Sequence, residues 1–207
     1  MSTRTMKLAL QHFQSERLRR DHADLAQEPQ YRLLGAFFFE ELYGPRDFTA
    51  RDQQARRLQQ FVHLAPGLNI GDVEKVLELL DLSNQLDDVI VELLLQIGAP
   101  PDFDEATYER AYRLADNYGA RLRQLDLVRD SLYNVHRISS RPLVGLALNR
   151  TEQLAAAVGM ADIHRFLRRG YAAIQPVRDM PRFVETVYLR EKERLDRIFA
   201  DQVRQAA

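Results

Sequence analysis

Five side chains with acid, base or charge chemistry interrupt helix faces that are otherwise apolar in this sequence. Glu41 follows Phe38 by three residues and Leu34 by seven, so helical periodicity puts its carboxylate on an apolar stripe. In the expected helix 120–138, the face that carries leucines at 122, 125 and 132 also carries Arg129, Tyr133 and His136. In the last expected helix, Glu191 lies among Val184, Val187 and Leu195. The candidate site residues are therefore Glu41, Arg129, Tyr133, His136 and Glu191.

A charge inside a protein costs several kcal/mol unless it is paired, so we expect these groups to meet. We predict that Glu41, and with it Glu191, pairs with Arg129, while Tyr133 and His136 complete the hydrogen bonds. The first interpretation is a buried ion-pair network that fixes helix register. The second is a polar pocket that binds a small anion or performs proton chemistry. A third is that one or more of these side chains simply reach the surface.

Motifs that carry known chemistry are missing from the sequence. None of the five histidines follows a glutamate by three residues, which argues against a ferritin-like di-iron site. The sequence contains no His-Glu-x-x-His, no phosphate-binding loop, no Gly-x-Gly-x-x-Gly and no Gly-x-Ser-x-Gly. We therefore assign no catalytic residue, no metal ligand and no cofactor, and we expect a protein that is not an enzyme.

The elements that must position these residues are helices. The nine glycines and eight prolines fall between segments with helical periodicity, and no window alternates apolar and polar residues as a strand would. We predict an all-α fold, a single compact bundle of about eight or nine helices over residues 1–207, with frayed ends at about 1–5 and 201–207. The helix at 31–43 is apolar on every side, so we expect it at the centre of the bundle. Pro142 starts a short, strongly apolar helix at 143–148.

Composition places further bounds on function. The chain of 207 residues is 45% hydrophobic and 29% charged, which is ordinary for a globular protein, and it has no cysteine. The lack of cysteine excludes disulfides and thiolate chemistry and fits a reducing compartment. The N-terminus has no signal peptide pattern and no segment is apolar over about 20 residues, so we expect a cytoplasmic protein that does not span a membrane.

These observations leave three functional hypotheses. The first is a non-enzymatic helical module that binds another protein or a second copy of itself. The second is a bundle that binds or converts a small ligand with the buried polar residues. The third is anion or nucleic-acid binding through the arginines at 165–182, which the formal net charge of −1 and the absence of an aromatic platform disfavour.

The stretch Phe-Phe-Phe-Glu-Glu-Leu-Tyr-Gly-Pro-Arg-Asp-Phe at 37–48 resembles the signature of the bacterial "FFLEELY motif" proteins. Arg51-Asp52, the segment 141–146 and the stretch from Phe166 to Glu191 fit the same pattern, so the resemblance spans most of the chain. Phe39 replaces the usual leucine. The resemblance implies a bacterial cytoplasmic protein of a family without known function, and it supplies no catalytic residue, cofactor or substrate.

Overall fold

The computed structural model describes residues 1–38, 53–54, 57 and 70–200, and these residues form helices and no strand. The prediction of an all-α fold is confirmed. The helices in these ranges are α1 (Thr3–Asp21), α2 (Ala23–Gln27), α3 (Arg32–Phe37), α5 (Ile70–Gln96), α6 (Glu105–Ala115), α7 (Tyr118–Ser139), α8 (Pro142–Arg150), α9 (Glu152–Ala157), α10 (Ala161–Ile174) and α11 (Met180–Ile198).

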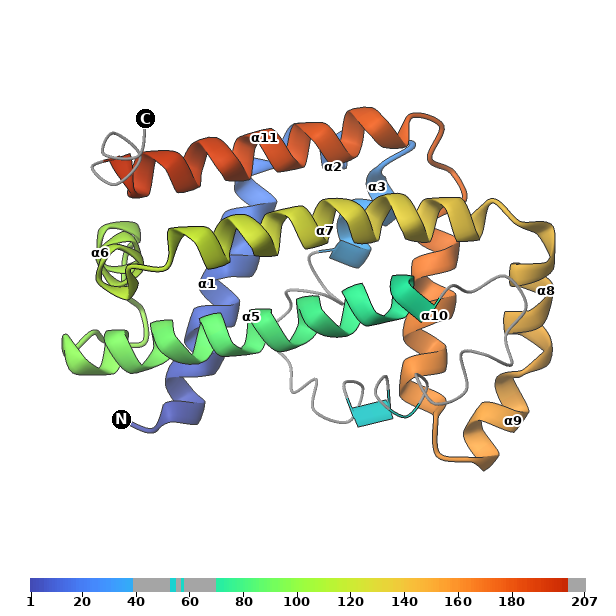
Figure 1. Ribbon diagram of the computed structural model, residues 1–207, viewed down its shortest axis with the longest axis horizontal. Helices are drawn as coiled ribbons and strands as arrows, with labels where there is room; N and C mark the ends of the chain where they lie inside the picture. The colour runs from blue at the N-terminus through green and yellow to red at the C-terminus, as the bar shows by residue number, and fades with distance from the viewer. Residues whose placement is uncertain (39–52, 55–56, 58–69, 201–207) are drawn as a thin grey trace.

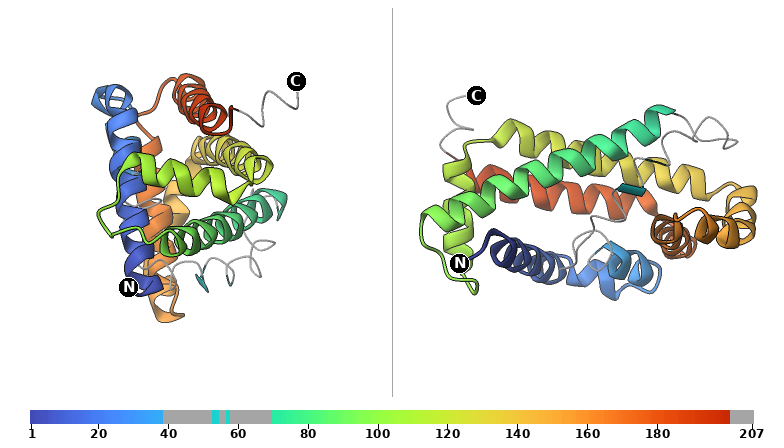
Figure 2. Two further views of the ribbon diagram at one scale, coloured as in Figure 1. Left: turned by 90° about the vertical axis from the view of Figure 1, so that its left-hand side faces the viewer. Right: turned by 90° about the horizontal axis from the view of Figure 1, so that it is seen from below.

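The helices form two layers. The long helices α5, α7 and α11 lie side by side in one layer, with α7 packed against both of the others (Figure 1). In the second layer, α1 crosses α5 near one end and α10 packs on α3 near the other end (Figure 2). Helix α6 closes the first end of the bundle, and α8 and α9 lie against α10 at the opposite end.

Helix starts follow the capping chemistry of the sequence. Asp104 accepts a hydrogen bond from the backbone N–H of Thr107 at the start of α6, at 2.9 Å. Asp179 does the same for Arg182 at the start of α11. Ser2 caps α1 by accepting a hydrogen bond from the backbone N–H of Thr5, and the helix begins at Thr3. Residues 201–207 lie outside the described ranges.

The apolar core has two parts. The first lies where α1, α5 and α6 meet the end of α11, and includes Met6, Leu10, Ile90, Leu94, Tyr108 and Phe199. The second lies between α1–α3 and the start of α11, and includes Leu18, Leu25, Tyr31, Leu34, Phe183 and Val187. The polar side chains described below lie among these two groups. No helix within the described ranges has both the length and the apolar character to cross a membrane.

Two features differ from the sequence predictions. The amphipathic spacing predicts one helix from about Thr5 to Gln27, but this helix is divided at His22, whose φ of −120° and ψ of 21° leave the helical region, so α2 starts as a separate element. The described part of the expected central helix, α3, is also not buried on every side. Tyr31 and Leu34 are buried, but Leu33 is 53% exposed, since the main contacts of α3 with the other described helices are those with α2 and α10. The remainder of segment 31–43, from 39 onward, lies outside the described residues.

Candidate functional site

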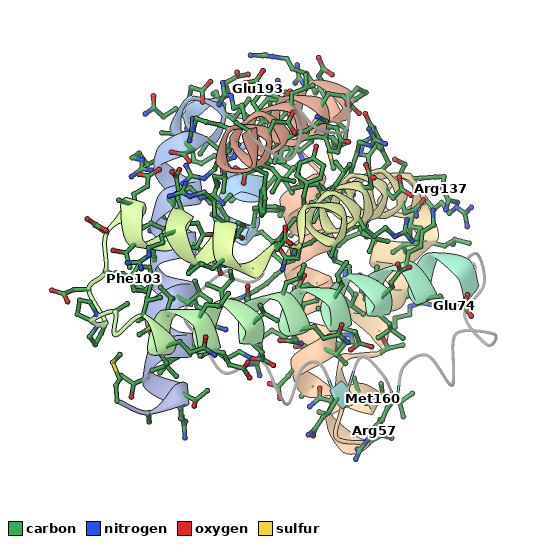
Figure 3. All side chains as sticks on the ribbon, turned by 60° about the vertical axis from the view of Figure 1, so that its left-hand side comes forward. Arg57, Glu74, Phe103, Arg137, Met160 and Glu193 are labelled. Atoms are coloured by element: carbon green, nitrogen blue, oxygen red, sulfur yellow. The ribbon has the colours of Figure 1, made fainter. Side chains whose placement is uncertain are left out.

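Glu191, a predicted site residue on α11, is paired across the bundle with α1. Its two carboxylate oxygens accept hydrogen bonds of 2.5 and 2.6 Å from Nη1 of Arg17, and Oε1 lies 2.9 Å from Nε2 of His22. The side chains of Glu191, Arg17 and His22 are 13%, 8% and 3% exposed. Figure 3 shows Glu193, two residues further along α11, pointing away from the protein. Glu191 is therefore turned inward, and its arginine partner is Arg17 rather than Arg129.

The charge on Glu191 is stabilised inside the protein by these neighbours. Burial by itself would raise the pKa of Glu191, but the positive charge of Arg17 and the hydrogen bonds from His22 and Arg17 outweigh it and hold that pKa at about 2. Burial by itself would lower the pKa of Arg17, but the negative charge of Glu191 and the hydrogen bond to it outweigh burial and raise that pKa. The two charges thus remain on Glu191 and Arg17 over the whole physiological range, and the pair is a fixed ion pair instead of a proton-transfer device.

The other described candidates take part in separate interactions on the α7–α11 interface. The guanidinium of Arg129 lies over the ring of Tyr188, 4.4 Å from its centroid, and 3.6 Å from a carboxylate oxygen of Asp126. The hydroxyl of Tyr133 donates a hydrogen bond of 2.8 Å to Glu185. His136 is half-buried on the same helix. The structure therefore does not bring Arg129, Tyr133, His136 and Glu191 into one hydrogen-bonded group, and Glu41 lies outside the described residues.

Two members of the observed ion-pair network, Arg17 and His22, were not predicted. The signal for Arg17 was present, because Arg17 follows Leu10 by seven residues and Met6 by eleven and so lies on the buried stripe of α1. This is the argument that selected Glu191. No comparable signal existed for His22, whose burial depends on the break between α1 and α2.

A second buried polar group joins α1, α5 and α7. Arg121 is 4% exposed, donates to the backbone carbonyl of Leu86 and to Gln124, and lies over the ring of Tyr112 at 4.4 Å. Nearby, Gln14 donates to Asp87 at 3.1 Å, and burial raises the pKa of that carboxyl. These groups connect helices that are far apart in sequence, which is typical of a structural network.

The cavity that borders the ion pair is small and apolar. Its free volume is about 10 Å³, roughly the space of one water molecule, and its lining consists of His22, Leu25, Ala26, Gly35, Phe38, Phe183 and Val187. Pockets for drug-sized ligands usually measure about 300–1,000 Å³ and carry several convergent polar groups. The described residues also contain no cluster of acidic and histidine side chains that could hold a metal ion.

Helices α8 and α9 form the one extended surface of the described protein on which apolar side chains recur at helical spacing and face solvent. Thr151 is a bend that separates the two helices: its N–H donates to Ala147 O at the end of α8, and its carbonyl accepts from Ala155 N at the start of α9. The inner side contacts α10. Gly145 faces Tyr171, and the carbonyl of Leu148 accepts a hydrogen bond of 2.9 Å from Nε2 of His164. Glu152 forms an ion pair with Arg168. The opposite side therefore faces away from the bundle.

We call this opposite side the outer face of α8–α9. It consists of Leu143, Leu146, Ala147, Arg150, Leu154, Ala157 and Val158, all of them exposed. The four large apolar side chains on it are 74%, 45%, 64% and 56% exposed, in the order Leu143, Leu146, Leu154 and Val158. Leu143 and Leu146 lie one turn apart on α8, and Leu154 and Val158 lie one turn apart on α9 and its C-cap. Figure 1 shows both helices at the edge of the molecule.

The charge around this face is strongly positive. Residues 137–178 contain seven arginines and two carboxylates, a net charge of +5 in a chain whose total is −1. Several of these arginines are paired: Arg168 with Glu152, and Arg165 with Asp162 at 3.6 Å. Arg150, on the outer face, has no carboxylate within 4.0 Å in the part of the chain that the structure describes. The outer face of α8–α9 therefore combines exposed apolar side chains with one arginine between them.

Fold and site together define an all-helical bundle with a structural ion-pair core and an uncovered apolar face. The chain belongs to the family described as Domain of unknown function (DUF8198), whose model matches residues 2–205. No curated protein and no solved structure matches the chain. The description of the family assigns no function.

Proposed function

We propose that the protein is a non-enzymatic interaction module and that a helical segment of another protein docks on the outer face of α8–α9. The observation that carries the proposal is the group of four exposed large apolar residues on the two consecutive short helices α8 and α9. Other exposed leucines and valines in the described ranges, such as Leu33, Leu114 and Leu189, are single residues on different helices. Single exposed apolar residues are ordinary, whereas a contiguous group usually marks an interaction site.

The remaining polar features support a structural role. The Glu191–Arg17–His22 group is closed by its own hydrogen bonds, and the cavity beside it offers a ligand one histidine and otherwise apolar walls. The arginines at 165–182 are largely engaged by carboxylates, including Arg182 with Glu28 at 2.5 Å. These pairings leave few guanidinium groups free for phosphates, and they disfavour the anion-binding hypothesis.

A display experiment tests the proposed docking surface. Helical segments tiled across the proteome of the source organism are selected on the purified chain, and each bound segment is then measured against two variants. Leu146→Asp/Leu154→Asp changes the outer face, and Leu33→Asp/Leu189→Asp is the matched control because these leucines are comparably exposed on α3 and α11.

We expect at least one segment to bind with a dissociation constant in the micromolar range. The face variant should weaken it about tenfold or more, whereas the control variant should leave it unchanged. If every bound segment retains its affinity for the face variant, or if none binds, the proposed docking surface is wrong.

We also propose that residues 1–207 form a single domain, located in the bacterial cytoplasm and related to the FFLEELY-motif proteins. The family match over 2–205 and the pairing of Arg17 on α1 with Glu191 on α11 support one domain. The absence of cysteine and the motif at 37–48 support the other two statements. One cooperative unfolding transition, identical by fluorescence and circular dichroism, is the expected result for a single domain.

A further inference from the structure

The outer face of α8–α9 carries one charge, and that charge lies at its centre. Arg150 follows Leu143 by seven residues and precedes Val158 by eight, so apolar turns extend to both sides of it. Glu152, the nearest carboxylate along the chain, points to the inner side, where it pairs with Arg168. A partner that covers the stripe must therefore bury the guanidinium of Arg150 or neutralise it.

A second copy of this chain does not fit that requirement. Two identical faces related by a two-fold axis would lie either parallel or antiparallel, and in both arrangements residues near the centre of the face would meet their own copies. Arg150 would then face the Arg150 of the second copy, and the face has no acidic residue to separate them. Two like charges at the centre of an apolar interface are destabilising.

A lipid surface fits less well than a protein helix. Helices that lie on membranes carry their arginines on the polar side and usually have aromatic residues on the apolar side. Here the arginine interrupts the apolar stripe itself, and residues 143–158 contain no aromatic side chain. The surrounding charge of +5 over residues 137–178 favours an acidic partner and would accelerate its association.

We infer that the outer face of α8–α9 receives an acidic amphipathic helix of another protein, which packs its apolar side along Leu143, Leu146, Leu154 and Val158 and places a carboxylate opposite Arg150. This inference rests on the proposed docking function and adds the charge and register of the partner. The apolar turns supply affinity, and the central ion pair selects the partner and excludes self-association.

Three synthetic helical peptides test this inference. They are 18-residue stapled helices with leucines on one side and are identical except for the central residue of that side, which is Glu, Gln or Lys. Binding to the full chain is measured by fluorescence anisotropy at 50 and 300 mM salt. The same peptides are measured against Arg150→Glu, Arg150→Gln and Leu146→Asp/Leu154→Asp.

We expect the Glu peptide to bind the wild-type chain about fivefold more tightly than the Gln peptide and more tightly still than the Lys peptide. Arg150→Glu should invert this order of affinities, and Arg150→Gln should abolish the differences between the three peptides. Higher salt should make the differences for the wild-type chain smaller. Leu146→Asp/Leu154→Asp should remove binding of all three peptides.

The other outcomes separate the two proposals. Binding that depends on the leucines but is equal for the three peptides overturns the central carboxylate and retains the docking surface. Absence of binding, or binding indifferent to Leu146→Asp/Leu154→Asp, overturns both. Binding of the wild-type chain to vesicles with 30% anionic lipid that Leu154→Asp abolishes, or a dimer in sedimentation that the same change dissociates, assigns the face to a membrane or a second copy and overturns the inference.

Discussion

At the scale of single residues, Glu191 shows how an ionised carboxylate is kept inside this bundle. It is inward-facing on α11, and Arg17 and His22 on the other layer donate to it. The pKa of Glu191 is about 2 in the folded chain, against an ordinary value of 4.5. A depressed pKa in the folded state means that the group stabilises the fold when it is ionised.

The sign of this linkage gives a pH prediction. The contribution of Glu191 is complete above about pH 5 and is lost as the pH falls towards 2, and it amounts to about 3 kcal/mol in the free energy of unfolding. Glu191→Gln should therefore be less stable than the wild-type chain at pH 7, and the difference should shrink at pH 3. Urea unfolding at both pH values measures it. A difference independent of pH would contradict the assigned pairing.

A double substitution separates the cost of burying charge from the value of the pair. Arg17→Met alone should destabilise the fold by about 3–5 kcal/mol, because it leaves the carboxylate of Glu191 buried without its cation. Arg17→Met/Glu191→Leu should cost less than this single change, because no uncompensated charge remains. The free energies of unfolding of the wild-type chain, of both single variants Arg17→Met and Glu191→Leu, and of the double variant at pH 7 provide the measurement. Equal and additive losses would show that the two groups do not interact.

At the scale of helices, a close approach decides how α10 packs on α3. A Cβ atom at Gly170 would lie 3.1 Å from the ring of Phe37, and the rings of Phe37 and Phe166 are 5.1 Å apart. Gly170 therefore lies at a close contact between α10 and α3. The site has no room for a larger side chain unless Phe37 moves.

Two glycine substitutions should therefore have opposite effects. Gly170→Val should destabilise the fold by about 1–3 kcal/mol, because it overpacks the interface between α3 and α10. Gly119→Ala, near the start of α7, meets nothing within 4 Å and should stabilise the fold by about 0.4–1 kcal/mol through the lower entropy of the unfolded chain. Thermal unfolding of the two variants compares them directly. A neutral Gly170→Val would show that the contact is not tight.

At the scale of the whole molecule, the net positive charge and the group of exposed large apolar side chains lie at the same end. The bundle end formed by α8, α9 and α10 has the excess of arginines, whereas the rest of the chain is acidic. The same end carries the outer face of α8–α9. A stable core and a separate uncovered face are compatible because no core residue belongs to that face.

This separation predicts that the face can be changed without loss of the fold. Leu143→Asp/Leu154→Asp should alter the free energy of unfolding by less than about 0.5 kcal/mol per site, because both side chains are largely exposed. The variant should also need more ammonium sulfate to precipitate than the wild-type chain, since less apolar surface is in contact with water. A large loss of stability would mean that these leucines pack against part of the protein.

The local pattern of the sequence determined the all-α fold, because helical periodicity and capping residues act within a few turns. It also determined that Glu191 lies on a buried helix side. The arginine that pairs with Glu191 depends on which helices cross, and the sequence carries no direct signal for the crossing of helices. Arg129 and Arg17 both interrupt apolar stripes, and only the position of α1 across the bundle selected Arg17.

The same reasoning explains the outer face of α8–α9. The apolar run at 143–148 predicts a helix, but it does not say which side of that helix is covered. Which side is buried depends on the packing of α10. Gly145, Leu148 and Glu152 contact residues of α10, so the opposite side is left in solvent. Periodicity along a chain fixes the faces of its helices, whereas the tertiary arrangement alone decides which faces are buried.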